Sequence, residues 1–161
     1  MLKLSIICTV FITLISCSND AIIFDSYTSI PEAKWHKDSI LKFEFNPIDT
    51  IAKNNVYVNL RSTKEFAFNN LFLIVDINFP NQTIVTDTLE YEMANAEGKF
   101  LGTGLTDLKE NKLEYKTNVT FPNTGTYTIS VQHAMRKSGD VKGIVLLDGI
   151  SDVGIQIEKQ N

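Results

Sequence analysis

Apolar and polar residues alternate along most of the chain with a period of two, the spacing of β-strands that have one buried face. Ile40–Phe45 (ILKFEF) alternates apolar and charged residues. Asn70–Phe79 (NLFLIVDINF) is the most apolar stretch after the N-terminus, and it predicts a central strand buried on both faces. The same pattern predicts strands over 55–61, 83–93, 113–121, 126–135 and 152–159, with a short strand at 144–147.

Turn residues separate these segments and indicate the fold class. Residues 79–82 (FPNQ) and 121–126 (FPNTGT) place Pro and Asn directly after an aromatic residue, which stops a strand. No apolar stripe of three helical turns is present, although 106–115 (TDLKENKLEY) leaves room for one helical turn before its strand. We therefore expect an all-β protein, an antiparallel β-sandwich of about seven to nine strands, either Ig-like or jelly-roll-like.

One local motif is typical of β-sandwiches. Asn123–Tyr127 (NTGTY) has the spacing of a tyrosine corner, in which the phenol bonds back to the backbone near the start of a strand. A plain hairpin turn followed by a strand tyrosine has the same pattern. Both interpretations stay open at this point.

The N-terminal segment is apolar and then ends abruptly at a cysteine. Leu4–Ile15 has the length of a secretory signal's hydrophobic region and is too short for a membrane-spanning helix, which needs about 20 residues. It runs into Leu14-Ile15-Ser16-Cys17, the order of a bacterial lipobox: a large aliphatic residue, a permissive residue, a small residue and the cysteine that receives a diacylglyceryl group. A plain signal peptide or a buried core strand is the alternative.

These features divide the chain into three parts. We expect residues 1–16 to be a lipoprotein signal peptide, 17–37 a lipidated N-terminus with a tether or a strand leading into the fold, and 38–161 a single β-sandwich domain. Cys8 would leave with the signal peptide, so Cys17 would be the mature chain's one cysteine and its membrane anchor. The domain must then fold without disulfides.

Charge and composition exclude some partners. The chain of 161 residues has a formal net charge of −4, and its acidic and basic residues are interspersed without a basic patch. Nucleic-acid binding needs such a patch, so we do not expect it. No second hydrophobic segment of the sequence is long enough to cross a membrane.

The sequence offers no recognisable catalytic or metal-binding motif. His36 and His133 lie far apart and lack the spacing of metal ligands, and no Gly-x-Ser-x-Gly elbow is present. Glu90 and Glu92 share one face of their expected strand, but their alternation with apolar residues is more typical of a solvated face. We therefore expect no catalytic residues, no enzymatic activity, no cofactor and no metal.

The segment 31–39 (PEAKWHKDS) contains the chain's single tryptophan, Trp35, beside His36. A tryptophan in a loop can stack on a sugar or serve as a protein-binding hot spot, so Trp35 and His36 are candidate interaction residues. Trp35 can equally close one end of the sandwich, and we favour that second role.

Three tripeptides share the form Asp-Ser/Thr-aliphatic, which resembles the O-glycosylation sequon of exported proteins in the phylum Bacteroidota. Coincidence at strand edges, where Asp, Ser and Thr collect, is the alternative explanation. The candidate O-glycosylation sites are Ser39, Thr50 and Thr88.

Most of the mature sequence resembles the GldH family of gliding-motility lipoproteins from Bacteroidota. The resemblance covers about residues 24–158. It is carried by the segments WHKDS, NLFLIVDINFPN, DTLEYEMANAEGKFLGTGLTDLKENKLEYK, FPNTGTYTISVQHAMR and GISDVGIQIE.

This resemblance implies a cell-envelope lipoprotein of the gliding machinery, which is linked to type IX secretion. The expected partners are the membrane, through the modified cysteine, and other envelope proteins of gliding or secretion. A glycan-binding lipoprotein, with Trp35 and nearby tyrosines stacking on sugars, is the alternative. Ser18-Asn19-Asp20 lacks a run of acidic residues that would mark surface export, so we expect the periplasmic face of the outer membrane.

Overall fold

The computed structural model describes residues 21–104 and 106–160, so the expected signal peptide and Cys17 lie outside the described residues. The described chain forms antiparallel strands and one short 3-10 turn, η1 (Pro31–Ala33). The strands are β1 (Ile22–Ser29), β2 (Lys34–His36), β3 (Leu41–Phe45), β4 (Asn54–Ser62), β5 (Asn70–Asn78), β6 (Ile84–Glu92), β7 (Lys109–Val119), β8 (Tyr127–His133), β9 (Leu146–Asp148) and β10 (Ile150–Lys159).

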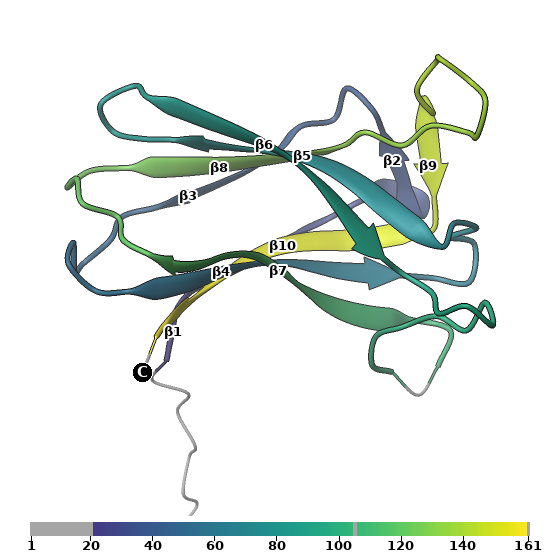
Figure 1. Ribbon diagram of the computed structural model, residues 1–161, viewed down its shortest axis with the longest axis horizontal. Coiled ribbons are helices and arrows are strands. Elements are labelled where there is room, and N and C mark those ends of the chain that lie inside the picture. The colour runs from purple at the N-terminus through teal and green to yellow at the C-terminus, as the bar shows by residue number, and fades with distance from the viewer. Residues whose placement is uncertain (1–20, 105, 161) are drawn as a thin grey trace, which may run out of the picture.

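Eight of these strands form two stacked sheets (Figure 1). The first sheet has the order β1-β10-β4-β7, and the second has the order β3-β8-β5-β6. We call them the first sheet and the second sheet. Along the chain, β1 pairs with β10, β3 with β8, β4 with β7, and β5 with β6. Among these eight strands in chain order, the first pairs with the last, the second with the second-last, and so on. This nested pairing is that of a jelly roll.

A small ribbon made of β2 and β9 closes one end of the sandwich (Figure 1). Trp35, at the centre of β2, pairs with Leu147 of β9, and both side chains are fully buried. The indole Nε1 donates a hydrogen bond to the carbonyl oxygen of Ser39 at 2.9 Å, which satisfies its one polar group. The tryptophan therefore seals this end of the core.

The core lies between the two sheets, because strand alternation turns every second side chain inward. From the first sheet, β4 contributes Val56, Val58 and Leu60, and β10 contributes a matching row. The end opposite the β2–β9 ribbon is filled by aromatic rings packed around Tyr127, including Phe45 at 5.5 Å and Phe121 at 5.1 Å between ring centroids. The inward row of β10 is Val153, Ile155 and Ile157.

The structure confirms the all-β sandwich and decides between its two expected forms. Strand pairing selects the jelly roll over the Ig-like arrangement. The bond from the phenol back to the backbone that defines a tyrosine corner is also found. The buried phenol oxygen of Tyr127 accepts a hydrogen bond from the backbone N–H of Asn123 at 3.0 Å. This bond ties the turn to the strand that follows it.

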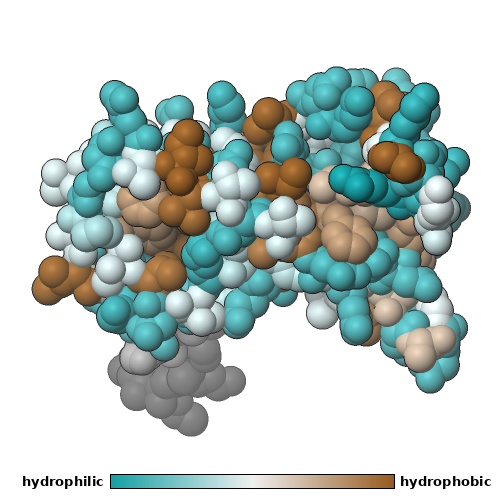
Figure 2. All heavy atoms as spheres, turned by 45° about the horizontal axis from the view of Figure 1, so that its top comes forward, coloured by the Kyte–Doolittle hydropathy of each residue, from teal (hydrophilic) through white to brown (hydrophobic). Residues whose placement is uncertain are grey.

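Two expectations are wrong. Strand β5 is central, but only one of its faces is fully buried, because no further layer of the described residues covers the outside of the second sheet. Phe72 and Ile74 are half-exposed there, and Figure 2 shows hydrophobic side chains among hydrophilic ones on that side. Residues 106 and 107 form bends and residue 108 is irregular, with no helical turn, since Lys109 already begins β7 by pairing with Ser62.

Residues 22–36 supply two strands, one to the first sheet and one to the closing ribbon. Strand β1 pairs with β10 from Ile22 to Ser29, although its alternation is broken by a register shift near Phe24. The part of the chain that follows the expected lipidation site therefore leads directly into the sandwich.

Candidate functional site

The outer face of the first sheet is polar along all four of its strands. On β4 the outward side chains are those of Tyr57, Asn59 and Arg61, which alternate with the inward aliphatic row. Register places each beside a neighbour on β7: Tyr57 beside Glu114, Asn59 beside Lys112 and Arg61 beside Glu110. On the other side β10 and β1 add Asp152, Gln156, Asp25, Tyr27 and Ser29.

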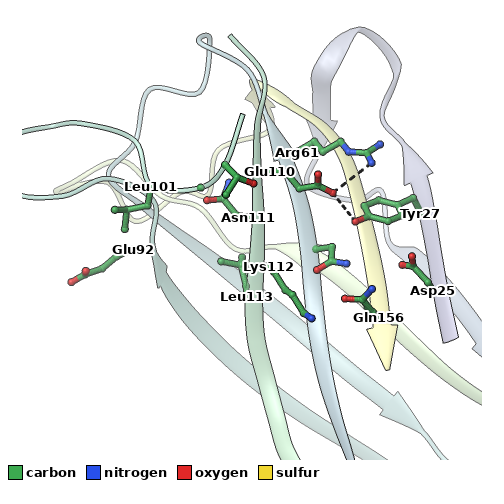
Figure 3. A pocket seen from close by; sticks show the side chains of 13 residues that line it. Asp25, Tyr27, Arg61, Glu92, Leu101, Glu110, Asn111, Lys112, Leu113 and Gln156 are labelled. Atoms are coloured by element: carbon green, nitrogen blue, oxygen red, sulfur yellow. Dashed lines mark hydrogen bonds and ion pairs between the residues drawn. The ribbon is translucent and has the colours of Figure 1, made fainter. Parts of the chain in front are cut away.

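A groove of about 600 Å³ lies on this face (Figure 3). Its floor is formed by the four strands, and the loop at residues 101–103 forms part of its wall. This volume is in the range of small-molecule sites, although such sites usually have mainly apolar walls. The side chains that line the groove include Asp25, Tyr27, Asn59, Arg61, Glu92, Glu110, Lys112 and Gln156.

The ring of Tyr27 lies across a glycine at the centre of the sheet. A Cβ atom added to Gly154 would approach the ring carbon Cδ1 of Tyr27 to 2.7 Å and the carbonyl oxygen of Ser26 to 2.8 Å. Only a residue without a side chain leaves room for the ring here. The guanidinium carbon of Arg61 lies 4.6 Å from the ring centroid, in the position of a cation–π contact.

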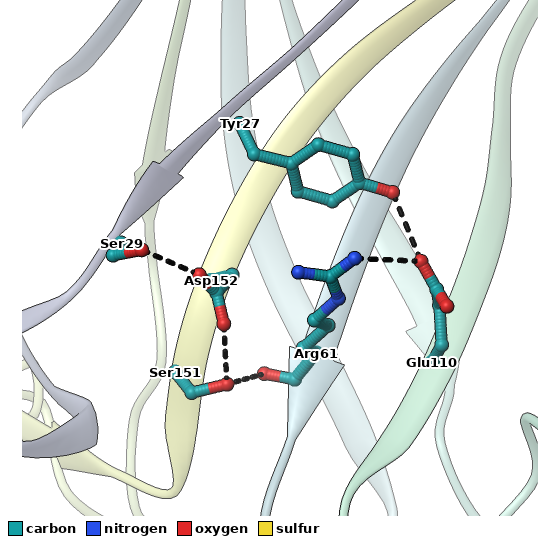
Figure 4. Close-up of polar contacts among 6 residues, drawn as sticks. All are labelled: Tyr27, Ser29, Arg61, Glu110, Ser151 and Asp152. Carbon is teal, nitrogen blue, oxygen red and sulfur yellow. Dashed lines mark hydrogen bonds and ion pairs between the residues drawn. The ribbon is translucent and has the colours of Figure 1, made fainter. Parts of the chain in front are cut away.

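The phenol of Tyr27 and the guanidinium of Arg61 converge on one carboxylate. Tyr27 donates its hydroxyl hydrogen to Oε1 of Glu110 at 3.0 Å, and Nη2 of Arg61 lies 3.5 Å from the same oxygen (Figure 4). Burial and the bond to Glu110 raise the pKa of Tyr27 to about 12. The phenol therefore keeps its proton at neutral pH and acts as a hydrogen-bond donor.

A second branch of the network fixes the strand backbone beneath Arg61. Asp152 accepts hydrogen bonds from Ser29 at 2.7 Å and Ser151 at 2.8 Å, and the Ser151 hydroxyl lies 3.3 Å from the carbonyl oxygen of Arg61 (Figure 4). The register between β10 and β4 shifts between Ile150 and Asp152. This shift brings Ser151 and Asp152 together on the polar network.

Asn59 lines the groove and has a buried polar atom that lacks a partner among the described residues. Its side chain is 5% exposed, and its carbonyl oxygen Oδ1 accepts no hydrogen bond. Asn111 also lines the groove, but its side chain is on the inward row of β7 and its orphaned atom is the amide nitrogen. An unpaired buried oxygen costs about 1–3 kcal/mol, so it needs an explanation.

The rest of the floor is held in place by ordinary surface contacts. Lys112 donates a hydrogen bond to Oε1 of Glu158 at 2.6 Å, and its nitrogen lies 4.1 Å from the centroid of the Tyr57 ring. Gln156 is only 9% exposed and lines the groove beside Asn59. The groove thus offers fixed amides, a phenol and ion-paired charges, a set suited to hydrogen-bonded recognition.

The two interaction residues predicted from the sequence, Trp35 and His36, differ in their exposure to solvent. Trp35 is completely buried, so it is a core residue and its ring cannot stack on an external sugar or partner. The physical reason is its pairing in β2, which turns the ring into the sandwich. His36, its neighbour, is exposed and its role as a contact residue stays a prediction.

The second histidine, His133, packs inside the sandwich against Trp35. The two ring centroids lie 5.4 Å apart, edge to face, and Nε2 of His133 lies 3.1 Å from the carbonyl oxygen of Trp35. The carbonyl can only accept, so Nε2 carries the hydrogen and Nδ1 is left without a partner. Burial lowers the pKa of His133, which is therefore neutral at pH 7.

The remaining sequence candidates lie on the surface or outside the described residues. Ser39 and Thr88 are exposed and Thr50 is half-buried, so their glycosylation stays a prediction. Cys17 is not among the described residues. Glu90 lies on an exposed strand face, where it accepts a hydrogen bond from the amide of Asn70 at 2.8 Å.

Neither a metal centre nor a membrane-spanning helix is found in the described part of the chain. No cluster of three or more His, Cys, Asp or Glu side chains within residues 21–104 and 106–160 could hold a metal ion. The same ranges hold no helix that is long and apolar enough to cross a membrane.

Sequence comparison identifies the family of this chain. A family profile described as GldH lipoprotein matches residues 22–157. A gliding motility lipoprotein GldH homolog from Christiangramia forsetii is 46% identical over 150 residues, which cover 93% of this chain and 91% of that protein. The chain belongs to the GldH lipoprotein family.

A second GldH relative supports the same assignment over the same length. The gliding motility lipoprotein GldH of Flavobacterium johnsoniae is 45% identical over 150 residues, covering 93% of this chain and 92% of that protein. The resemblance found in the sequence is therefore confirmed. Membership in a lipoprotein family implies a lipid-anchored protein of the cell envelope.

Solved structures add little to this assignment. The VP2 subviral particle of infectious bursal disease virus matches with a TM-score of 0.38 and 17% identity, and the Gx strain of that virus with 0.37 and 15%. The chain spans only 34% and 30% of these viral chains. Similarity this low carries no functional inference, and the jelly-roll assignment rests on strand pairing alone.

Proposed function

We propose that this GldH protein is a non-enzymatic, lipid-anchored module that docks on an envelope protein of the gliding machinery, which is linked to type IX secretion. Docking uses the polar outer face of the first sheet. The observation that carries this proposal is the buried, unpartnered Oδ1 of Asn59 on the floor of a groove rich in hydrogen-bonding groups. A partner's N–H or O–H would satisfy it.

The chemistry of the groove favours binding over catalysis. Tyr27 keeps its proton, and Glu110 is held by both Tyr27 and Arg61, so neither group is poised as a base. The hydroxyl of Ser151 bonds to Asp152 and faces no histidine in the described network, unlike an activated serine nucleophile. These groups are arranged to hold a ligand by hydrogen bonds.

Anchoring takes place through Cys17, which we place at the periplasmic face of the outer membrane. The thiol of Cys17 loses its proton and its sulfur attacks the glyceryl carbon of a phospholipid, so that the C–S bond of the thioether replaces the C–O bond to the departing headgroup phosphate. Hydrolysis of the peptide bond before Cys17 by water then leaves this residue at the N-terminus. Cys17→Ala should move the protein from the membrane to the soluble fraction. Cys8→Ala, which changes a cysteine of the signal peptide, should leave it membrane-bound.

Docking can be tested with a photo-crosslinking amino acid placed on either outer face. Lys112 lies in the groove of the first sheet, and Thr86 is exposed on β6 of the second sheet. In intact envelopes, the label at 112 should give a discrete crosslinked product with a gliding or secretion protein, and the label at 86 should not. Equal products from both positions, or none from 112, would contradict the proposal.

Glycan binding is the second candidate function, and the groove itself favours it. Buried amides at Asn59 and Gln156 beside the phenol of Tyr27 are groups that bond to sugar hydroxyls. Trp35 takes no part, since it is buried. Titrating the protein with neutral oligosaccharides and peptidoglycan fragments would distinguish the two functions, because saturable binding that is lost in Asn59→Ala would favour the glycan.

A further inference from the structure

Two isoleucines stand exposed at the end of the sandwich opposite the β2–β9 ribbon. Ile48 is fully exposed and Ile51 is 84% exposed, and both belong to the loop of residues 46–53 between β3 and β4. An apolar groove of about 600 Å³ adjoins the loop, lined in part by Ile23, Phe24 and Pro47. Exposed aliphatic side chains gathered in this way mark a contact surface.

The loop is a fixed structure rather than a loose connection. Oδ1 of Asp49 accepts hydrogen bonds from the backbone N–H groups of Ile51 and Ala52, both at 3.0 Å. Oδ2 of Asp49 also lies 3.9 Å from the ammonium of Lys159, which partly offsets its charge. These contacts hold Ile48 and Ile51 outward on a rigid turn.

The same loop lies beside the point where the chain enters the domain. The N–H of Lys159 donates to the carbonyl oxygen of Ala21 at 2.6 Å, and the N–H of Gln160 donates to that of Lys53 at 2.8 Å. The end of β10 therefore joins the loop to the N-terminal entrance.

The tether is short compared with the domain. Three residues separate Cys17 from Ala21, which makes four steps along the chain, and at about 3.5 Å per step a fully extended chain reaches about 14 Å. A compact domain of this size has a radius of gyration of about 14 Å as well. The end that carries Ala21 must therefore stay close to the lipid surface.

We propose that Ile48 and Ile51 insert into the interfacial region of the lipid leaflet that holds the Cys17 anchor. This inference rests on the proposed lipid anchoring. Lys53 and Lys159, at the base of the loop, lie where lipid phosphates would meet them. Loop insertion would fix the orientation of the domain, with the β2–β9 ribbon directed away from the membrane and the polar groove facing sideways.

The test uses the mature lipidated protein in phosphatidylglycerol–phosphatidylethanolamine vesicles. The thiol of Cys17 is consumed by the thioether, so a cysteine introduced at Ile48 (I48C) would be the single free thiol and can carry an environment-sensitive fluorophore. The matched control is V141C, because Val141 is also an exposed aliphatic residue, 89% exposed, in the loop between β8 and β9.

We expect the label at 48 to shift its emission to shorter wavelength and to be quenched by lipids that carry a nitroxide near the headgroup. The label at 141 should do neither. If the protein floats with the vesicles while both labels stay water-exposed and unquenched, anchoring stands and loop insertion is overturned. If the protein does not float, the anchoring proposal fails and loop insertion fails with it.

A second copy of the chain is the competing occupant of this surface. Contact between copies would shift the emission of the label at 48 in proportion to protein density on the vesicles, without quenching by the lipid nitroxide. That outcome would also overturn the proposal. A double variant, Ile48→Ser with Ile51→Ser, should still float but should leave a label at Ile23→Cys more exposed to water.

Discussion

Strands β4 and β10 present two faces with opposite properties. Their inner face is a closed aliphatic surface that includes Val58, Leu60 and Ile155, all with no exposed area. Their outer face carries Asn59 and Arg61 on β4 and Gln156 on β10, and it includes the buried oxygen of Asn59, which has no partner among the described residues. This aliphatic part of the inner face has no polar group to satisfy, while the outer face has a buried oxygen that a bound partner would satisfy.

The difference separates the residues that make the fold from those that we assign to binding. A substitution on the inner face should change the free energy of unfolding. A substitution on the outer face should change recognition with a small effect on stability. Each prediction below tests this division, from the largest expected effect to the smallest.

Leu60→Ala should cause the largest loss of stability. Its side chain is fully buried between the sheets, so truncation removes apolar contacts and leaves a cavity, at a cost of about 2–5 kcal/mol in the free energy of unfolding. Chemical denaturation would measure this. Gln156→Ala, on the outer face of the neighbouring strand, serves as the control and should cost about 1 kcal/mol or less.

Gly154→Val should disturb the outer face through steric conflict. A Cβ atom at this position lies 2.7 Å from the ring of Tyr27, so valine displaces the ring and breaks its bond to Glu110. Overpacking of this kind costs about 1–3 kcal/mol. Tyr27→Ala in the same background should recover part of the loss, and no recovery would show that the clash lies with the backbone of Ser26.

His133 should make the inner face sensitive to acid. Its pKa is lowered in the folded protein, mainly by burial, so the unfolded chain binds a proton more readily. The stability is therefore fully present above the unfolded pKa of about 6.5 and is lost as the pH falls from there toward the lowered folded value. Denaturation midpoints between pH 7.5 and 5 in the wild type and in His133→Gln would show it, with the steeper loss in the wild type. His36→Gln is the exposed control.

Glu110→Gln should have the smallest effect on stability. The carboxylate is partly exposed, and exposed ion pairs such as the one with Arg61 contribute about 0–1 kcal/mol. The substitution also removes the charge that holds Tyr27 and Arg61 in place. Thermal unfolding should therefore change little, while crosslinking from position 112 should weaken, and an unchanged product would argue against a role for this network.

Much of the fold follows from the sequence, because strand alternation is a local property. The pattern in 55–61 and 152–159 predicted two strands with one aliphatic face, and both are found in the first sheet. The choice of a jelly roll over an Ig-like sandwich depends on which distant strands pair, as β1 does with β10. Local pattern holds no information on that pairing.

The groove illustrates the same limit for function. The sequence shows that Tyr57, Asn59 and Arg61 share a face, but not that Gly154 lies beside them to make room for Tyr27. For Trp35 the sequence left two roles open, an exposed contact residue or a side chain that closes the end of the sandwich, and we favoured the second. The structure shows that second role, because pairing with Leu147 turns the tryptophan into the core.

The account's central claim is that the outer face of the first sheet keeps an unpaired polar group in order to bind. Asn59→Leu tests it most directly, with stability and crosslinking from position 112 measured on the same protein. We predict that the free energy of unfolding stays the same or rises, since a costly buried oxygen is removed, and that the crosslinked product disappears. A variant that is clearly destabilised yet still crosslinks like the wild type would contradict the claim.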